Sequence, residues 1–386
     1  MRQSLRNDAL PSRYARRARP LRTLLFGALA AASIAAPMFV NANSGWNDGA
    51  VYALTNATGG NDVVVFNRGN DGRLNGRRSF ATGGNGSGGG LGNQGALAFS
   101  DSGQWLLAVN PGSDSVSVFY SVGNYLFRTD IESSGGVRPV SVTIEDDLVY
   151  VLNAGSDDVQ GFRLGIYGRL TPIAGSRRAL SGAGTAPAQV EFNRDGDLLA
   201  VTEKATNKIL TFAVDGDGTL GPATITDSPS PTPFGFAFGR RDTLLVSEAA
   251  GGAAGASTLS SYRLNGNAGV VPVSAAVPSG QSAACWVTTT RDGRFAYVSN
   301  TASGNLSRYR ISSGGAATLG AAIAAVTGAG SGPTDMALDR NSRFLYSLNP
   351  GNSTISAFRV QNDGALQWIE HEPSGLATFA TGLVVR

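Results

Sequence analysis

The chain has 386 residues, of which 52 are glycine, 42% are hydrophobic and 15% are charged, and its formal net charge is +3. Cys285 and His371 are the only cysteine and histidine, which excludes an internal disulfide framework and any metal site built from these two residue types. The ordinary apolar fraction and the low charge exclude a largely disordered chain. We expect no metal and no other cofactor.

The N-terminal segment has the pattern of a secretory signal. Seven arginines precede an alanine-rich apolar run from Leu24 to about Ala36, and small residues follow up to Ala42. This order predicts a signal peptide over residues 1–42, cleaved near Ala42, and export to the periplasm or the cell exterior. The run is too short and too weakly apolar for a membrane anchor, so no transmembrane segment is expected.

Removal of the signal peptide reverses the sign of the net charge. Residues 1–42 contain seven arginines and Asp8, so their removal turns +3 into −3. A basic surface is the usual requirement for binding nucleic acid. The exported chain is therefore not expected to have a nucleic-acid partner.

A repeated unit fills residues 43–386. Each copy has a short apolar stretch, an Asp-Gly type of turn, an aromatic-rich strand that ends in Asn or Glu, a Gly/Ser turn and an alternating strand; residues 95–120 and 285–309 are clear copies. The second-strand ends mark seven units, spaced by 43 to 54 residues: Asn56, Asn110, Asn153, Glu203, Glu248, Asn300 and Asn349.

Repeats of this length predict a β-propeller. The alternation of Val, Phe and Tyr between Gly, Asp and Asn indicates antiparallel strands joined by tight turns, four per unit, as in a propeller blade. We expect an all-β, seven-bladed β-propeller that forms a single domain over residues 43–386, and a monomer. The first unit lacks an inner strand, which residues 382–385 at the C-terminus can supply to close blade 1.

Three of the strand ends share a pattern close to Y-V-x-N: residues 150–153, 297–300 and 346–349. With the Gly/Ser turns and apolar strands that follow, they resemble the seven-bladed β-propeller lactonase family of 6-phosphogluconolactonases and carboxymuconate cyclases, including secreted bacterial members with YVTN-type repeats. The resemblance spans residues 43–386 and implies lactonase activity. Its muconate cyclases use histidine, arginine and glutamate in the central funnel, whereas His371 is expected in the outer hairpin of blade 7, so that chemistry is not carried over.

Strand direction predicts where a site would lie. The start of the inner strand and the end of the second strand meet at one end of an antiparallel blade, around one mouth of the channel. Glu203 and Glu248 stand where other units have Asn, so each is interpreted as a candidate general acid or base; a salt bridge is the alternative, for Glu203 with Lys204 or Lys208.

The other candidates at this mouth would hold the substrate. Arg138 is expected to bind a substrate carboxylate or stabilise an oxyanion, with a plain surface arginine as the alternative. Four residues at the inner-strand starts are candidate substrate-binding residues: Gln94, Gln189, Trp286 and Asp335. Blade packing is the alternative for Trp286, and hydrogen bonding within the strands is the alternative for Asp335.

Two functions are compatible with the sequence. The first is an exported lactonase-type hydrolase that opens a lactone or ester of a small polar organic acid or sugar in the central channel, with Glu203 or Glu248 activating water and Arg138 stabilising the oxyanion. The second is a non-catalytic propeller that binds a ligand or a protein, because one fold serves many functions. The Gly/Ser-rich residues 83–92 are interpreted as a loop between the first two blades.

Overall fold

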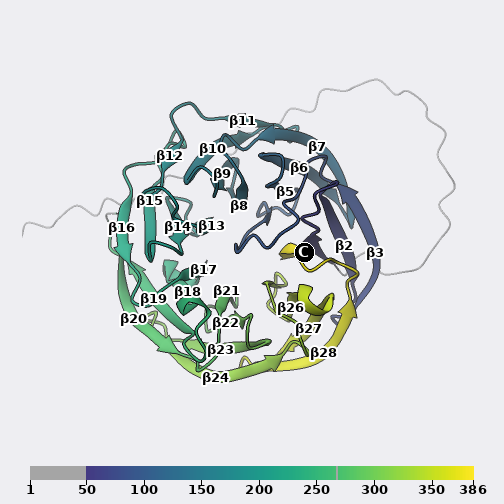
Figure 1. The fold of residues 1–386 in the computed structure, drawn as a ribbon, viewed down its shortest axis with the longest axis vertical. Helices are drawn as coiled ribbons and strands as arrows, with labels where there is room; N and C mark the ends of the chain where they lie inside the picture. Colours follow the sequence, from purple (N-terminus) through teal and green to yellow (C-terminus); the bar gives the residue numbers. More distant parts are fainter. Residues whose placement is uncertain (1–48, 267) are drawn as a thin grey trace, which may run out of the picture. The chain divides into compact units, whose positions relative to one another are not determined.

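The computed structural model describes residues 49–266 and 268–386, and the predicted signal peptide over residues 1–42 lies outside them. The described residues form seven antiparallel sheets, arranged as blades in a ring (Figure 1). The predicted all-β, seven-bladed propeller is thereby confirmed. Within the described part of the chain, no helix has the length and apolar character needed to cross a membrane.

Each blade extends from an inner strand near the axis to an outer strand at the rim. Blade 1 contains β29 (Thr381–Val385), β1 (Ala50–Leu54), β2 (Asp62–Arg68) and β3 (Leu74–Ala81). Blade 2 contains β4 (Leu97–Phe99), β5 (Trp105–Asn110), β6 (Ser115–Val122) and β7 (Tyr125–Ser133). Blade 3 contains β8 (Pro139–Glu145), β9 (Leu148–Asn153), β10 (Asp158–Leu164), β11 (Leu170–Pro172) and β12 (Arg178–Ala179), the last two both pairing with β10.

The remaining four blades repeat this order. Blade 4 contains β13 (Pro187–Phe192), β14 (Leu198–Glu203), β15 (Lys208–Ala213) and β16 (Thr224–Asp227). Blade 5 contains β17 (Pro233–Phe238), β18 (Leu244–Glu248), β19 (Thr258–Leu264) and β20 (Val270–Pro278). Blade 6 contains β21 (Ala284–Thr289), β22 (Phe295–Asn300), β23 (Asn305–Ile311) and β24 (Ala317–Val326). Blade 7 contains β25 (Asp335–Leu338), β26 (Phe344–Asn349), β27 (Thr354–Val360) and β28 (Leu366–Pro373). Short 3-10 helices cover Arg240–Asp242, Ala250–Gly252 and Pro350–Asn352.

The second strands of the blades lie in the core. Every residue of β9, β14, β22 and β26 is buried. Neighbouring blades cover both faces of each sheet, so these strands carry apolar or small polar residues at successive positions instead of alternating with charged ones. The outer strands face solvent and are mostly exposed, as in β3 and β24.

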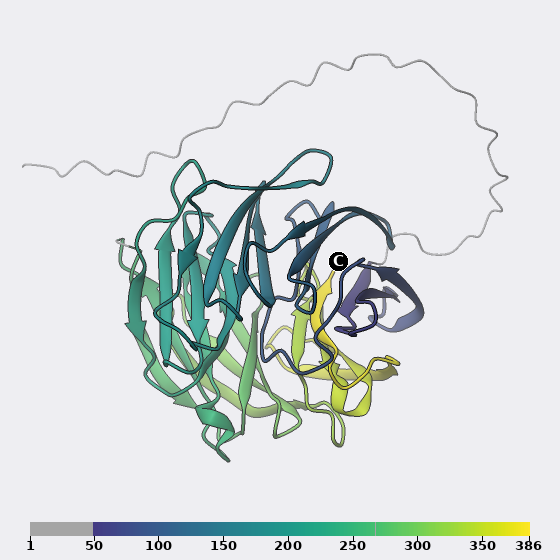
Figure 2. The same ribbon diagram turned by 45° about the horizontal axis from the view of Figure 1, so that its top comes forward.

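The C-terminal strand closes the ring. β29 pairs antiparallel with β1, with Val51 opposite Val385, and the backbones of Ala50 and Arg386 exchange two hydrogen bonds of 2.9 Å. Figure 2 shows this yellow strand beside the purple start of the propeller. The predicted closure of blade 1 is confirmed, and the reason is that β1 would otherwise leave an unpaired edge inside the ring.

Tyrosines of the Y-V-x-N strands join neighbouring blades. Each buried hydroxyl donates to the carbonyl of a glycine in the turn between the third and fourth strands of the next blade: Tyr150 to Gly218 at 2.8 Å, Tyr297 to Gly364 at 2.8 Å, and Tyr346 to Gly72 at 2.7 Å. These bonds connect blade 3 to 4, blade 6 to 7 and blade 7 to 1. The first residue of the pattern is therefore an inter-blade contact.

Candidate functional site

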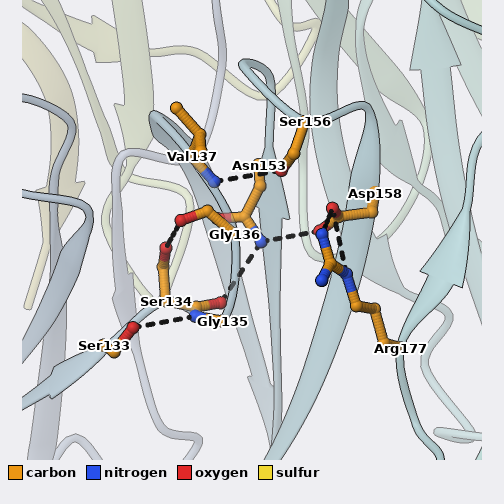
Figure 3. Close-up of polar contacts among 9 residues, drawn as sticks. All are labelled: Ser133, Ser134, Gly135, Gly136, Val137, Asn153, Ser156, Asp158 and Arg177. Carbon is orange, nitrogen blue, oxygen red and sulfur yellow. Dashed lines mark hydrogen bonds and ion pairs between the residues drawn. The ribbon is translucent and has the colours of Figure 1, made fainter.

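Four of the five strand-end asparagines hold the third strand of their own blade, whereas Asn56 of blade 1 donates to Ser87 Oγ and to the carbonyls of Gly89 and Phe379. In blade 3, Asn153 Nδ2 donates to Asp158 Oδ1 at 2.9 Å and to the Ser134 carbonyl at 3.2 Å, while Arg177 forms an ion pair of 2.5 Å with Asp158 (Figure 3). Three other blades use a serine hydroxyl on the third strand: Asn110 with Ser117 at 2.8 Å, Asn300 with Ser307 at 2.8 Å, and Asn349 with Ser356 at 2.7 Å. All four asparagines are fully buried, so their role is structural.

Glu203 occupies the same position in blade 4 with the opposite hydrogen-bonding role. Its side chain is fully buried, and it accepts from the Ser181 backbone N–H at 2.9 Å, from Ser181 Oγ at 2.5 Å and from Thr206 Oγ1 at 2.5 Å. Lys204, its neighbour in sequence, donates instead to the carbonyls of Gly92 and Pro187. Neutral donors from the segment that joins blades 3 and 4 and from the turn after β14 therefore engage this carboxylate.

Glu248 is enclosed in a similar way in blade 5. It is fully buried and accepts from Thr258 Oγ1 at 2.6 Å and from Ser228 Oγ at 3.4 Å. Burial raises the pKa of Glu248 to about 7, although hydrogen bonds from Ser260, Thr258 and Ser228 oppose the rise. A carboxyl with this pKa can hold or release a proton near neutral pH.

Arg138 lies on the surface where blade 3 begins. Its backbone N–H donates to Asp114 Oδ1 at 2.7 Å, and among the described residues none hydrogen-bonds or ion-pairs with its guanidinium group. Figure 3 shows the neighbouring turn, in which the Val137 N–H donates to Ser156 Oγ at 3.0 Å. Arg138, Glu203 and Glu248 are not among the residues that line the cavity of the central channel. Their catalytic role stays a prediction.

The central channel contains a cavity of about 680 Å³. Its polar lining consists of the amides Gln94, Gln189 and Asn193, the hydroxyl of Thr143, the carboxyls Glu191, Asp335, Glu145 and Asp101, and the arginines Arg194, Arg291 and Arg340. Three of the four predicted substrate-binding residues, Gln94, Gln189 and Asp335, are thus part of one cavity.

His371 lies on the outer strand β28, as its place in the repeat predicted.

A loop from blade 1 crosses the end of the channel where the inner strands begin. We call residues 83–95 the crossing loop (Figure 1). Asn93 donates to the Val140 carbonyl in blade 3 and accepts from Thr381 Oγ1 in blade 1, and Gln94 N–H donates to the Ala188 carbonyl in blade 4. The crossing loop therefore spans between opposite blades, and the cavity opens toward the turns at the other end of the inner strands.

Trp286 fixes the crossing loop from blade 6. Its indole N–H donates to the Asn93 carbonyl at 2.6 Å, and its ring lies 5.3 Å from the ring of Phe234. Trp286 is 4% exposed and does not line the channel cavity. Its observed contacts are those of a packing residue, and a contact with substrate stays a prediction.

Gln94 and Gln189 satisfy backbone groups of inner strands. Gln189 donates to the Phe236 carbonyl at 3.0 Å and accepts from the Phe236 N–H at 2.7 Å; Gln94 pairs in the same way with Val287, at 2.9 and 3.1 Å. An inner strand has no partner strand toward the axis, so these buried backbone groups need side-chain partners. The two amides are held rigidly at the base of the cavity.

Gln189 also orients the carboxyl group of Glu191. Glu191 follows Gln189 by two residues on β13, so both side chains point to the same side of the strand, and Gln189 Nε2 donates to Glu191 Oε2 at 2.7 Å. Among the described residues, none donates to the second oxygen, Oε1. Burial raises the pKa of Glu191 to about 8, against the lowering effects of Gln189 and Arg194.

Asp335 and Glu145 are the other carboxyls of the cavity with shifted pKa values. Asp335 is 3% exposed and accepts from the backbone N–H groups of Met336 at 2.8 Å and Leu383 at 3.1 Å, and burial raises its pKa to about 8. Burial, with the charges of Asp101, Asp146 and Asp195, raises the pKa of Glu145 to about 7. The cavity can therefore hold protonated carboxyls at neutral pH.

The open mouth has charges of opposite sign on opposite sides. Arg194, Arg291 and Arg340 follow the inner strands of blades 4, 6 and 7, whereas Asp101 and Glu145 stand at the same level in blades 2 and 3. Arg340 Nη2 donates to the Asp101 carbonyl at 3.1 Å and so joins the two sides. An acidic ligand that enters this mouth meets guanidinium groups before it reaches Glu191.

Glu191 and the three arginines were not among the candidate residues predicted from the sequence, because that prediction concerned the opposite end of the inner strands. The signal was present: Glu191 has the same parity as Gln189, and an arginine precedes the inner turn at positions 194, 291 and 340. Only the closure of the other end by the crossing loop makes these residues the accessible ones.

Comparison with known proteins supports the fold. No protein-family model and no curated protein sequence matches the chain. Similar solved structures include a Lactobacillus plantarum protein, with a TM-score of 0.70, 16% identity and coverage of 88% of this chain and 99% of that chain. A candidate 6-phosphogluconolactonase from Bacteroides fragilis has a TM-score of 0.67, 16% identity and coverage of 89% and 99%.

A third similar structure is the periplasmic gluconolactonase of Pseudomonas aeruginosa, with a TM-score of 0.68, 16% identity and coverage of 87% of this chain and 98% of that chain. The chain has the fold of these proteins. The resemblance seen in the Y-V-x-N strands thus extends to the whole propeller. At 16% identity the likeness concerns the fold alone.

Proposed function

We propose that the protein is a lactonase-like hydrolase, that its site is the channel cavity, and that Glu191 is the acid–base group. One observation carries the proposal: a carboxyl with a pKa raised to about 8 lines a polar cavity that is closed at one end, with one oxygen unengaged by the described residues. The lactonases among the similar structures support the reaction class. A small polar sugar or organic acid lactone suits a cavity lined by amides, carboxyls and arginines.

The reaction needs a base for water and a proton for the departing ring oxygen. Ionised Glu191 takes a proton from a water molecule as the water oxygen bonds to the lactone carbonyl carbon. When the bond between that carbon and the ring oxygen breaks, Glu191 returns the proton to the ring oxygen, and the product is the open hydroxy acid. Gln189 keeps Glu191 oriented throughout, and arginines at the mouth favour the negative charge that develops.

The first test is turnover of a panel of five- and six-membered sugar lactones. Glu191→Gln is expected to lower kcat/KM by about 100-fold or more, because it removes the base and keeps the shape of the side chain. Glu203→Gln, Glu248→Gln and Arg138→Ala are the comparison variants, since they test the strand-end site predicted from the sequence. Loss of turnover in these three and not in Glu191→Gln would move the chemistry to the strand ends.

The second test is the pH dependence of turnover. Because ionised Glu191 is the active form, kcat/KM is expected to rise with pH through about 8 and then level off, after subtraction of spontaneous lactone opening. Gln189→Met removes a hydrogen bond that lowers the pKa of Glu191, so the rise should move to higher pH. A profile that is flat between about pH 6 and 9 would contradict the assignment of Glu191.

The same panel distinguishes a hydrolase from a binding module. A wild-type protein that binds sugar acids in calorimetry and opens none of the lactones would be a ligand-binding propeller, the second function compatible with the sequence.

Export remains part of the proposal. Sequencing the N-terminus of the protein recovered outside the cytoplasm should show a chain that begins near residue 43.

A further inference from the structure

A second cavity lies beside the channel mouth, between the turns of blades 5, 6 and 7. It has a volume of about 750 Å³. Its charged lining consists of Arg240, Arg291, Arg294 and Arg343, with Asp292 as the one acidic residue among the described residues that line it. We call this cavity, with its four arginines, the arginine pocket. Positive charge therefore exceeds negative charge in this cavity.

Three guanidinium groups of the arginine pocket have no hydrogen-bond or ion-pair partner in the part of the chain that the structure describes. Among the described residues, none hydrogen-bonds or ion-pairs with the side chains of Arg240, Arg291 or Arg343, and all three are exposed. Two of these side chains are restricted in position: Arg343 lies over the ring of Phe344 at 5.3 Å, and the Arg240 stem packs against Gly293. Arginine heads held in this way lose little further freedom when an anion binds.

Arg294 and Asp292 form the frame of the cavity. Arg294 pairs with Asp292 at 3.0 Å and donates to the Asn362 carbonyl at 2.5 Å. Burial tends to raise the pKa of Asp292, but hydrogen bonds from Thr290 and Arg294 and the charges of Arg294 and Arg240 lower it overall. This carboxylate forms its ion pair with Arg294, and Arg240 acts on it through its charge without an ion pair among the described residues.

Two of the three blades that form the walls, blades 6 and 7, are hydrogen-bonded to each other. The Arg291 backbone N–H of blade 6 donates to Ser342 Oγ of blade 7 at 2.8 Å. Phe295 and Val360 supply apolar surface, while Thr290 and Gln361 supply neutral polar groups. The cavity therefore combines positive charge with apolar and neutral polar surface.

We propose that the arginine pocket binds a compact multivalent oxyanion, with phosphate or carboxylate groups paired to Arg240, Arg291 and Arg343. Guanidinium groups pair bidentately with either type of oxyanion, so a small ligand with two or more such groups can engage several arginines at once. Arg291 lines both this cavity and the channel cavity, so the two sites are neighbours. The site does not depend on the proposed lactonase reaction.

Isothermal titration calorimetry with pyrophosphate and with citrate tests the proposal on the full exported chain. At low ionic strength, wild type should bind one equivalent of at least one probe, and added salt should weaken the binding. Arg343→Gln and Arg240→Gln should each weaken it about tenfold, the effect of losing a charge-assisted hydrogen bond. Arg169→Gln is the matched control, because Arg169 is exposed on blade 3 and lines neither cavity, and its effect should be below about twofold.

The two probes separate the possible ligand groups. Binding of pyrophosphate alone would identify a phosphate site, and binding of citrate alone a carboxylate site. Arg343→Lys should fall between wild type and Arg343→Gln, because it keeps the charge and loses the bidentate geometry. Absence of binding by both probes at low salt, or equal losses in Arg169→Gln and Arg343→Gln, would overturn the proposal.

Discussion

Glu191, the proposed acid–base group, is oriented by a single neighbour. The amide nitrogen and oxygen of Gln189 both bond to the backbone of Phe236 in the next blade. The same amide nitrogen donates to Glu191 and so restricts the orientation of its carboxyl group. The carboxyl is partly buried, so the uncharged form is favoured, yet its other oxygen remains available to a ligand. Position and protonation are therefore set by the same strand.

The raised pKa values of Glu191 and Asp335 predict that stability falls as pH rises. In the unfolded chain these carboxyls ionise near their ordinary pKa values, whereas in the folded protein they keep their protons up to about pH 8. Between those values only the unfolded state is ionised, so the free energy of unfolding decreases with rising pH, by up to about 1.4 kcal/mol per pH unit for each such group.

Urea unfolding from about pH 5 to about pH 8 measures this slope. Glu191→Gln should show a shallower decline than wild type, because one of the carboxyls no longer ionises. Part of the decline should remain, since Asp335, Glu145 and Glu248 also have raised pKa values. Stability of wild type that increases with pH across this range would contradict the protonated state of these groups.

The two glutamates among the strand-end asparagines differ in hydrogen-bond direction. Asn110 donates to a hydroxyl of the third strand, whereas Glu203 and Glu248 accept from hydroxyls. A serine or threonine hydroxyl can do either, so the position tolerates both residue types when its partners are hydroxyls. This physical account of the substitution does not require catalysis.

At the scale of the strand, the Y-V-x-N pattern combines two contacts. In blade 6, the tyrosine at its start, Tyr297, bonds to Gly364 of the next blade, and the asparagine at its end, Asn300, bonds within its own blade. Gly364 has a φ of +80° and approaches the Phe295 ring so closely that a Cβ atom would lie 2.6 Å from it. The pattern thus specifies how adjacent blades meet.

Tyr297→Phe is expected to destabilise the propeller by about 1–2 kcal/mol, because it leaves the Gly364 carbonyl without its donor in a buried place. The free energy of unfolding in urea measures the loss. Tyr167→Phe is the control, since Tyr167 is 80% exposed, and its effect should be within about 0.5 kcal/mol. Equal effects of the two substitutions would show that the inter-blade hydroxyl contributes nothing specific.

These strand contacts explain why the sequence predicted the fold and much less of the site. The Y-V-x-N residues recur because every blade needs the same contacts with its neighbours, and a recurring pattern is visible in one sequence. Glu191 occurs once, on an inner strand whose other residues resemble those of the remaining blades. A residue that occurs in one blade only does not belong to the repeated pattern, so the pattern cannot indicate its role.

At the scale of the whole molecule, one strand from the C-terminus completes the ring. β29 covers the inner edge of β1 and brings Leu383, which is 4% exposed, against the core of blades 1 and 7. Asp335 of blade 7 accepts from the Leu383 N–H, so the closing strand is held from both sides. Closure and the channel lining therefore share residues.

Deletion of residues 381–386 should lower the free energy of unfolding by at least about 3 kcal/mol, because it removes the pairing with β1 and the burial of Leu383. Urea unfolding followed by tryptophan fluorescence measures the change, and size-exclusion chromatography detects association through the exposed edge of β1. An unchanged unfolding midpoint together with an unchanged elution volume would show that the ring does not depend on this strand.

The sequence by itself determined the seven blades, their strand order and the closure by the C-terminal strand. These features follow from alternation and from a repeat of about 50 residues, which are local properties of the chain. It also predicted that Gln94, Gln189 and Asp335 lie near the channel, because they stand at the starts of inner strands and strand direction fixes the end of the channel at which these starts meet.

The tertiary structure decided which end of the channel is open. The crossing loop is held in position by hydrogen bonds of Asn93 and Gln94. Their partners belong to four different blades and lie far away in the sequence. Contacts of this kind depend on the assembled ring and leave no period in the sequence. For the same reason, the grouping of Glu191 with the rim arginines, and the meeting of four arginines from three blades in the arginine pocket, became visible only in the folded molecule.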